Sequence, residues 1–402
     1  MQGQDHRSAP PLRPPDRDAA DGDDRDGARG LRAPVPEDGG RALRTGVARV
    51  DGVVQAAGRD ESPAGTSPDG WQRSSGGGRA DGGDFGPAGG VERAGPVRFD
   101  VAVPKDGYAW WYVDGLSDDG RSALTLIAFV GSVFSPYYAY ARRNGRGDPE
   151  NHCAFNVALY GDTPNRWTLT ERGRASLARD ATSLRIGPSS LAWDGKALTA
   201  RIDEIGMPIP RRVRGTLTIR PEIEPRRVFL LDRPGNHRWI PFAPRARIEV
   251  DLEEPALHWR GSAYLDGNAG DVPLERSFVD WTWSRADLAA GTAVLYDINR
   301  RDGTAHSIAA RFAPDGSVAP FAPPPAARLP TTGWRIARRT RTSGHAGIVR
   351  TLEDTPFYAR SLVESDILGE RVRSMHESLS LDRFDSRWVQ ALLPFRMPRA
   401  RR

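Results

Sequence analysis

Short stretches of alternating apolar and polar residues follow one another along most of the chain. Residues 216–220 (Thr-Leu-Thr-Ile-Arg) and 247–252 (Arg-Ile-Glu-Val-Asp-Leu) alternate over their whole length. A period of two places every second side chain on one face, as in a half-buried β-strand. Residues 191–202 read as two such strands joined at Asp194-Gly195. The pattern predicts antiparallel strands from about residue 96 onward.

Asp-Gly pairs stand where hairpins between these strands would turn. Such a pair favours a type I′ turn, because both central residues of that turn need a positive φ. The pairs are Asp119-Gly120, Asp194-Gly195, Asp302-Gly303 and Asp315-Gly316. Helical signals are few, and residues 284–290 and 358–368 are the two candidates. An all-β region of about 300 residues is too long for one small barrel, so two antiparallel barrels or sandwiches in tandem are expected.

Residues 1–95 differ from the rest of the chain. They hold nearly half of the 43 glycines and only two aromatic residues, Trp71 and Phe85. A segment with mixed charge and no hydrophobic period is predicted to be disordered. It is open whether it serves as a tether or regulatory tail, or is a passive extension or an over-called start of the reading frame.

Composition excludes several classes of protein. Cys153 is the only cysteine in 402 residues, so neither a disulfide framework nor a cysteine-based zinc site is expected. The sequence has no apolar run as long as the roughly 18 residues of a membrane-spanning helix, and no apolar core of a secretion signal at its start. Nucleotide-binding loops and hydrolase or metal-binding motifs are also absent, and the seven histidines are scattered.

The net charge of +5 comes almost entirely from arginine, since Lys105 and Lys196 are the only lysines. Such a composition is typical of a GC-rich genome, so the charge is a weak argument for nucleic-acid binding. We therefore expect no nucleic-acid partner. A mildly basic surface that touches anionic lipid fits the charge better.

Aromatic residues gather in two regions of the β-rich part. Residues 108–112 (Tyr-Ala-Trp-Trp-Tyr) begin the first region, and Trp239, Trp259, Tyr264, Trp281 and Trp283 belong to the second. These residues can be ordinary barrel core, or they can line a cavity for a large apolar ligand. Because side chains alternate in a strand, residues 108–112 cannot all line one cavity. Either Trp110 and Tyr112, or Trp111 alone, would face it.

A carboxylate stands within the second aromatic region. Tyr264 and Asp266 share one face of a strand, and Leu265 lies on the other. On an inward face beside Tyr and Trp, Asp266 would be desolvated, and its raised pKa would keep it protonated at neutral pH. The alternative is an ordinary Asp-Gly-Asn turn that ends the strand. Asp114, Asp118 and Asp119 are expected to be solvated at a turn.

Four segments resemble the acyclic carotenoid 1,2-hydratases of phototrophic bacteria, also called hydroxyneurosporene synthases. They are residues 108–114 (Tyr-Ala-Trp-Trp-Tyr-Val-Asp), 117–120 (Ser-Asp-Asp-Gly), 127–138 and 151–161. The resemblance covers roughly residues 97–400. It implies an all-β fold of two tandem lipocalin-like antiparallel β-barrel domains, at residues 96–270 and 271–402, behind a disordered tail at residues 1–95.

The resemblance also implies an activity. Family members add water across the terminal C1–C2 double bond of acyclic carotenoids such as neurosporene and lycopene, on the routes to spheroidene and spirilloxanthin. They use no cofactor, and the partners are the carotenoid and water. Because carotenoids are insoluble, we expect peripheral contact with lipid at the cytoplasmic face of the inner or photosynthetic membrane. Exposed aromatics and the basic end at residues 396–402 would make this contact, although that end can also be merely solvated.

By similarity to the family, Asp266 is the proton donor. Tyr264 and Trp239 are its partners, which either stabilise a cation or orient the donor. Expected substrate-binding residues come from both aromatic regions and the family-like motifs: Trp110, Trp111, Tyr112, Phe134, Tyr137, Tyr138, His152 and Trp259. For His152, a hydrogen-bonded structural histidine is the alternative. Two other functions stay open: a lipocalin-like polyene cyclase or pericyclase, and a carotenoid-binding protein without catalysis.

Overall fold

A computed structural model of the protein describes residues 92–161 and 165–400. Residues 1–91 of the predicted tail lie outside the described residues. Its last part does form structure, because β1 (Glu92–Arg93) pairs with β11 (Arg227–Leu230). The rest of the described chain is mostly antiparallel strand, which confirms the all-β prediction.

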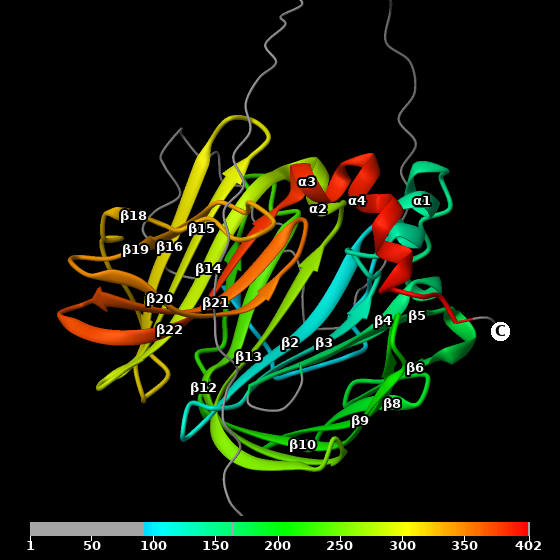
Figure 1. The fold of residues 1–402 in the computed structure, drawn as a ribbon, viewed down its shortest axis with the longest axis horizontal. Helices are drawn as coiled ribbons and strands as arrows, with labels where there is room; N and C mark the ends of the chain where they lie inside the picture. Colours follow the sequence, from blue (N-terminus) through cyan, green and yellow to red (C-terminus); the bar gives the residue numbers. More distant parts are fainter. Residues whose placement is uncertain (1–91, 162–164, 401–402) are drawn as a thin grey trace, which may run out of the picture. The chain divides into compact units, whose positions relative to one another are not determined.

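The first sheet has 13 strands and is nearly closed into a barrel, since β5 lies against β9 (Figure 1). Besides β1 and β11, its strands in spatial order are β5 (Arg166–Arg172), β4 (Cys153–Tyr160), β3 (Ala123–Val130), β2 (Tyr108–Ser117), β13 (Leu257–Gly270), β12 (His237–Glu254), β10 (Arg211–Ile223), β9 (Leu198–Gly206), β8 (Ser189–Trp193), β7 (Ser183–Ile186) and β6 (Leu177–Arg179).

The second sheet has seven strands. In spatial order they are β17 (Val318–Pro320), β16 (Ala305–Phe312), β15 (Gly291–Arg300), β14 (Phe278–Leu288), β22 (Glu370–Ser380), β21 (Tyr358–Ile367) and β20 (Ala346–Asp354). A separate pair is formed by β18 (Ala326–Leu329) and β19 (Arg338–Arg341).

Short helices gather at one edge of the two sheets (Figure 1). They are α1 (Pro136–Arg143), α2 (Leu274–Ser277), α3 (Leu381–Asp385) and α4 (Arg387–Leu392), with 3₁₀ turns η1 (Pro149–Asn151), η2 (Arg174–Ser176) and η3 (Leu393–Phe395). Ion pairs between Arg142 and Glu275 and between Arg143 and Asp385 hold α1 beside the others. The α1 helix starts where Ser135 accepts from the backbone N–H groups of Tyr137 and Tyr138.

All four Asp-Gly pairs lie at hairpin turns, as the sequence predicts. The turn type is different, because only the glycines have a positive φ, for example +70° at Gly120 and +93° at Gly195. The preceding aspartates remain in ordinary backbone regions, so these are not type I′ turns. The loops are also longer than two residues, and a single left-handed glycine closes them.

Both predicted helices are wrong. Residues 284–288 belong to β14, and residues 358–367 form β21. The alanines favour helix only weakly, and pairing of β14 with β15 and β22 on its two sides outweighs that preference.

The two faces of the barrel sheet have different surroundings. Trp111 and Val113 point into the barrel and pack in its apolar core with residues such as Leu126. Their neighbours Trp110 and Tyr112 point outward and belong to a second apolar cluster that includes side chains of the other sheet. The outer face of β2, β3 and β13 is therefore covered by the second sheet.

Candidate active site

A cavity of about 420 Å³ lies between the outer face of the barrel sheet and the second sheet. Strand register places the side chains of one row at the same level: Asp266 is opposite Tyr112, Tyr112 opposite Ile127, and Ile127 opposite Asn156. All four line the cavity. The opposing wall comes from the second sheet and its loops. Its members are Trp281, Trp283, Tyr296, Glu353, Phe357, Tyr358, Glu377 and Leu379.

Asp266 is held by two donors behind it. Tyr264 Oη donates to Asp266 Oδ2 over 2.8 Å, and Trp239 Nε1 lies 2.8 Å from the same oxygen and 3.0 Å from Tyr264 Oη. Asp266 Oδ1 is buried and has no hydrogen-bond partner among the described residues. Because Oδ2 already accepts two bonds, a proton on this carboxyl group belongs on Oδ1, where it is not donated to any described group.

Burial raises the pKa of Asp266 to about 8, against an ordinary value of 3.8. The hydrogen bonds from Tyr264 and Trp239 act in the opposite direction, and the negative charges of Glu377 and Asp114 add to the rise. Desolvation outweighs the two donors, so the carboxyl group is largely protonated at neutral pH. A protonated carboxyl in an apolar site is a general acid.

Two aromatic rings, Trp283 and Tyr112, pack against Tyr264 beside Asp266 on the cavity side. Trp283 lies 5.0 Å from Tyr264 and 5.9 Å from Tyr112 between ring centroids, and Tyr112 lies 6.0 Å from Tyr264. Trp283 and Tyr112 line the cavity. Aromatic faces in a dry site stabilise a nearby cation.

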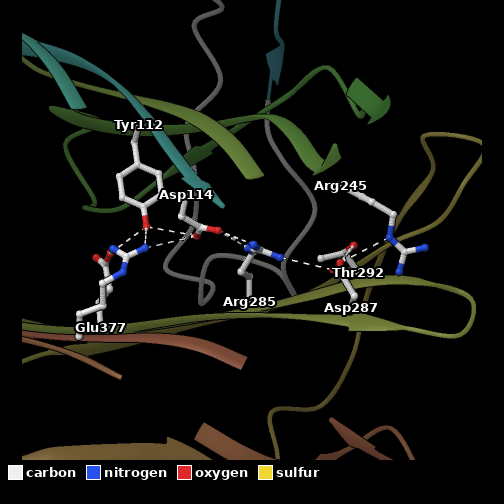
Figure 2. A network of polar contacts seen from close by, with 8 residues as sticks. Tyr112, Asp114, Arg245, Arg285, Asp287, Thr292 and Glu377 are labelled. Atoms are coloured by element: carbon white, nitrogen blue, oxygen red, sulfur yellow. Dashed lines mark hydrogen bonds and ion pairs between the residues drawn. The ribbon is translucent and has the colours of Figure 1, made fainter. Parts of the chain in front are cut away.

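A network of polar side chains joins the two sheets beside the cavity (Figure 2). Glu377 accepts from Tyr112 Oη over 2.9 Å and pairs with Arg360, which also donates to Tyr112. Arg285 Nε donates to Asp114 Oδ1 over 2.8 Å. The prediction that Asp114 is solvated is therefore wrong: it lies within β2, is fully buried, and is neutralised by an arginine of the other sheet.

The chain of ion pairs continues away from the cavity. Arg285 also approaches Asp287, which accepts from Thr292 over 3.0 Å and lies 3.4 Å from Arg245 (Figure 2). These contacts tie β2 and β12 of the barrel to β14 and β15 of the second sheet. They fix the wall that carries Trp283 against the wall that carries Asp266.

A third carboxyl group faces the cavity. Tyr160 Oη donates to Glu353 Oε2 over 2.6 Å, and burial raises the pKa of Glu353. Glu353 lies on β20 and Tyr160 on β4, so this contact also joins the two sheets.

The structure separates the predicted substrate-binding residues into two groups. Trp110, Tyr112 and Phe134 line the cavity, which decides the choice within residues 108–112 in favour of Trp110 and Tyr112. Trp111, Tyr137, Tyr138, His152 and Trp259 do not line it, and neither do Tyr264 and Trp239. Tyr264 and Trp239 instead contact Asp266 from the side away from the cavity.

Each residue outside the cavity has a structural surrounding of its own. Trp111 and Trp259 pack on the inner face of the barrel. Tyr138 Oη donates to the carbonyl of Gly107 over 2.7 Å, and Tyr137 is half-buried on the same helix. His152 lies 2.9 Å from Glu171, which also pairs with Arg399. This is the hydrogen-bonded arrangement that was the alternative for His152.

Three residues of the facing wall went unnoticed in the sequence: Glu353 and Glu377, which line the cavity, and Arg360, which pairs with Glu377. A signal was present for Arg360, because it interrupts the apolar strand of residues 357–363 and is fully buried. Buried charges in such strands need a partner. Within residues 92–161 and 165–400, no cluster of three or more His, Cys, Asp or Glu could hold a metal ion. No helix in the same residues is long and apolar enough to cross a membrane.

Two sheets that enclose an aromatic cavity with a buried carboxyl group of raised pKa define the class of protein: one that takes up an apolar ligand. The chain belongs to the carotenoid hydratase CrtC family, whose model matches residues 126–402. It is 54% identical over 372 residues to an acyclic carotenoid 1,2-hydratase of Thiocapsa roseopersicina, covering 92% of each chain.

Two further relatives carry the same name. The one from Rubrivivax gelatinosus is 53% identical over 402 residues, covering 99% of this chain and 98% of its own. The one from Cereibacter sphaeroides is 41% identical over 278 residues, covering 68% of this chain and 98% of its own. The alignment with the Rubrivivax gelatinosus protein also includes residues 1–95, whereas the resemblance in sequence motifs began only at about residue 97.

Proposed function

We propose that this enzyme adds water across the terminal C1–C2 double bond of acyclic carotenoids such as neurosporene and lycopene, in the formation of spheroidene or spirilloxanthin. The product is a tertiary alcohol at C1. One observation carries the proposal: Asp266, with a pKa of about 8 and an unbonded Oδ1, lines an aromatic cavity in a member of the carotenoid hydratase family.

The acid step suits the position of Asp266. An alkene is a very weak base, so it needs an acid that is not already hydrogen-bonded to water or protein. The proton on Oδ1 passes to C2, and the π electrons of the double bond form the new C–H bond. The positive charge is left on C1, which is tertiary. Tyr264 and Trp239 then stabilise the Asp266 carboxylate through their two bonds to Oδ2.

The cavity wall supports the cation. Trp283 and Tyr112 present aromatic rings beside the acid, and each ring contributes about 2 kcal/mol when the site is dry. Glu377 on the facing wall adds a negative charge within electrostatic range of Asp266. About 1.4 kcal/mol corresponds to tenfold in rate, so these groups together account for several orders of magnitude.

Water completes the reaction. Its oxygen attacks C1, and the proton that it then loses returns to the Asp266 carboxylate. The acid is regenerated, and the balance is one water consumed for each double bond. The polar groups Asn156 and Asn268 line the cavity on the barrel side and can hold this water.

Substrate and enzyme have to meet at lipid, because an acyclic carotenoid is insoluble in water. The proposal therefore includes peripheral association with the cytoplasmic face of the inner or photosynthetic membrane. The basic C-terminal residues are one contribution to such contact.

Incubation of the pure protein with lycopene in ¹⁸O-labelled water tests the proposal. The expected product is a 1-hydroxy carotenoid that carries the label, formed without any added cofactor. An isomer without added oxygen would identify a polyene cyclase or pericyclase instead. Tight binding with unchanged pigment would identify a carotenoid-binding protein, and either result would overturn the hydratase proposal.

A further inference from the structure

The mouth of the cavity is bordered by exposed apolar side chains. Trp334, Leu392 and Phe395 line the cavity and are also among the exposed large apolar residues, with 69% of Phe395 accessible to solvent. Trp388 is exposed as well, and its ring stacks on Trp334 with 6.3 Å between centroids. We call these four residues the rim.

Three of the four rim residues lie on the short helices after the last strand, and Trp334 comes from the segment between β18 and β19. Trp388 and Leu392 are four residues apart on α4, so they lie on one face of the helix. Val389 and Leu393 are buried in the apolar cluster between the sheets and anchor the other face. Rim residues are therefore held outward by well-packed neighbours, which is unusual for large apolar side chains without a partner.

Positive charge accompanies the rim. Residues 381–402 contain six arginines and two aspartates, Asp382 and Asp385. Both aspartates are engaged by arginines outside this segment, Arg301 and Arg143. Of the six arginines, Arg399 is paired with Glu171, and the segment still keeps an excess of positive charge. Exposed Arg387 and Arg396 belong to it.

The arginines and the aromatic rings of this surface are also interleaved. Arg383 lies 5.8 Å from the ring centre of Trp388, and Arg396 lies 4.6 Å from that of Trp167 at the cavity. Aromatic rings with arginines beside them are the composition that protein surfaces adopt at the headgroup level of a bilayer.

We infer that the rim docks on an anionic lipid bilayer and passes the end of the substrate from lipid directly into the cavity. Docking itself follows from the exposed rim and its charge, whereas the identity of the cargo rests on the proposed function. Lipid is the occupant that both properties fit, because apolar side chains enter the acyl boundary while arginines meet phosphate headgroups. Since three of the four rim residues, Trp334, Leu392 and Phe395, also line the cavity, an apolar chain can move inward without crossing water.

The test compares two variants with the unmodified protein. Trp388→Ser combined with Arg387→Glu alters the surface without touching a residue that lines the cavity. Leu368→Asn is the matched control, because it also removes an exposed apolar side chain. Leu368 lies at the β21–β22 turn, separated from α3 by the 11 residues of β22, and its positive φ suits asparagine.

Binding is measured by flotation with phosphatidylglycerol vesicles and with phosphatidylcholine vesicles. The unmodified protein and Leu368→Asn should bind the anionic vesicles more strongly than the neutral ones. The double variant should lose about tenfold or more in partitioning. Its hydration of lycopene embedded in vesicles should fall in parallel, whereas hydration of detergent-solubilised lycopene should stay within about twofold.

Three results would overturn the inference: unchanged vesicle binding by the double variant, an equal loss of activity in detergent and in vesicles, or self-association through the rim. Light scattering reveals the last as a dimer of the unmodified protein that the double variant abolishes. If the unmodified protein hydrates no lycopene in detergent, the proposed function fails, and vesicle binding still decides the docking surface on its own.

Discussion

Replacing Asp266 by asparagine should abolish hydration and at the same time stabilise the protein at neutral pH. Asparagine has nearly the same shape, and its carbonyl oxygen can take the place of Oδ2 as acceptor for Tyr264 and Trp239. Its amide group cannot donate a proton to an alkene. The activity loss and the stability gain have one cause, namely a carboxyl group buried where its charged form is disfavoured.

The magnitude of the stability gain follows from the pKa. Asp266 titrates at about 8 in the folded protein and at an ordinary value of 3.8 when exposed. Between these values the unfolded chain ionises and the folded chain does not, so the free energy of unfolding falls as the pH rises. Each pH unit above 3.8 lowers the free energy of unfolding by about 1.4 kcal/mol, so about 4 kcal/mol is lost by pH 7. Asp266→Asn removes this loss.

Urea unfolding at pH 4 and at pH 7 checks the reasoning. At pH 4 the carboxyl group is neutral in the folded protein and only about half ionised in the unfolded chain, so the variant and the unmodified protein should differ in stability by less than about 1 kcal/mol. At pH 7 the variant should be more stable, by at most about 4 kcal/mol. Equal stability at pH 7 would show that Asp266 is ionised in the folded protein. Retention of more than about a tenth of the activity would refute its role as the acid.

Three further predictions concern the groups around the acid. The kcat/KM for hydration should decline as the pH rises through about 8, where Asp266 loses its proton. Glu377→Gln should move this decline to lower pH, because the charge of Glu377 raises the pKa of Asp266. An unchanged midpoint in the pH–rate profile of the variant would contradict this coupling. Trp283→Ala should lower kcat roughly thirtyfold while Trp283→Phe stays within about fivefold, and equal losses in initial rate would argue against a cation-stabilising ring. Asp114→Asn should lower the free energy of unfolding, measured in urea, by roughly 3–5 kcal/mol, because it leaves Arg285 buried without its carboxylate. The control Asp118→Asn, in the exposed pair with Arg247, should lower it by less than about 1 kcal/mol. Similar losses in the two variants would mean that the buried pair is not structurally important.

Local sequence patterns identified strands and turns because these depend on a few adjacent residues. Alternation correctly places Tyr264 and Asp266 on one face, and the Asp-Gly pairs correctly mark hairpins. Alternation cannot tell which face is inward, however. Trp110 and Trp111 were equivalent on that criterion, and only the position of the second sheet distinguishes them.

The facing wall of the site was beyond the reach of local patterns. Glu377 comes to the cavity from β22, far along the chain from Asp266. Trp283 comes from β14, which follows β13 in the chain but belongs to the other sheet, and no spacing rule relates either residue to Asp266. Strand pairing also explains why the predicted helix at residues 284–290 is wrong. β14 pairs with β15 and β22, and these contacts outweigh a weak helical preference. The burial of Asp114 could not be predicted for a related reason, because its partner Arg285 is 171 residues away in the sequence.

The raised pKa of Asp266 depends on both sheets. The interior of the barrel is packed with side chains such as Trp111 and Val113, and the cavity that Asp266 lines lies outside it. Asp266 lies on the outer face of the same sheet, where without a cover it would meet water and titrate as an ordinary aspartate. Trp283 and its neighbours on the second sheet exclude that water and raise the pKa. The buried ion pair between Asp114 and Arg285 holds the two walls together. It follows that a protein reduced to the barrel sheet would keep the Asp266 carboxyl group in its ionised form at neutral pH, without the proton that the proposed mechanism needs.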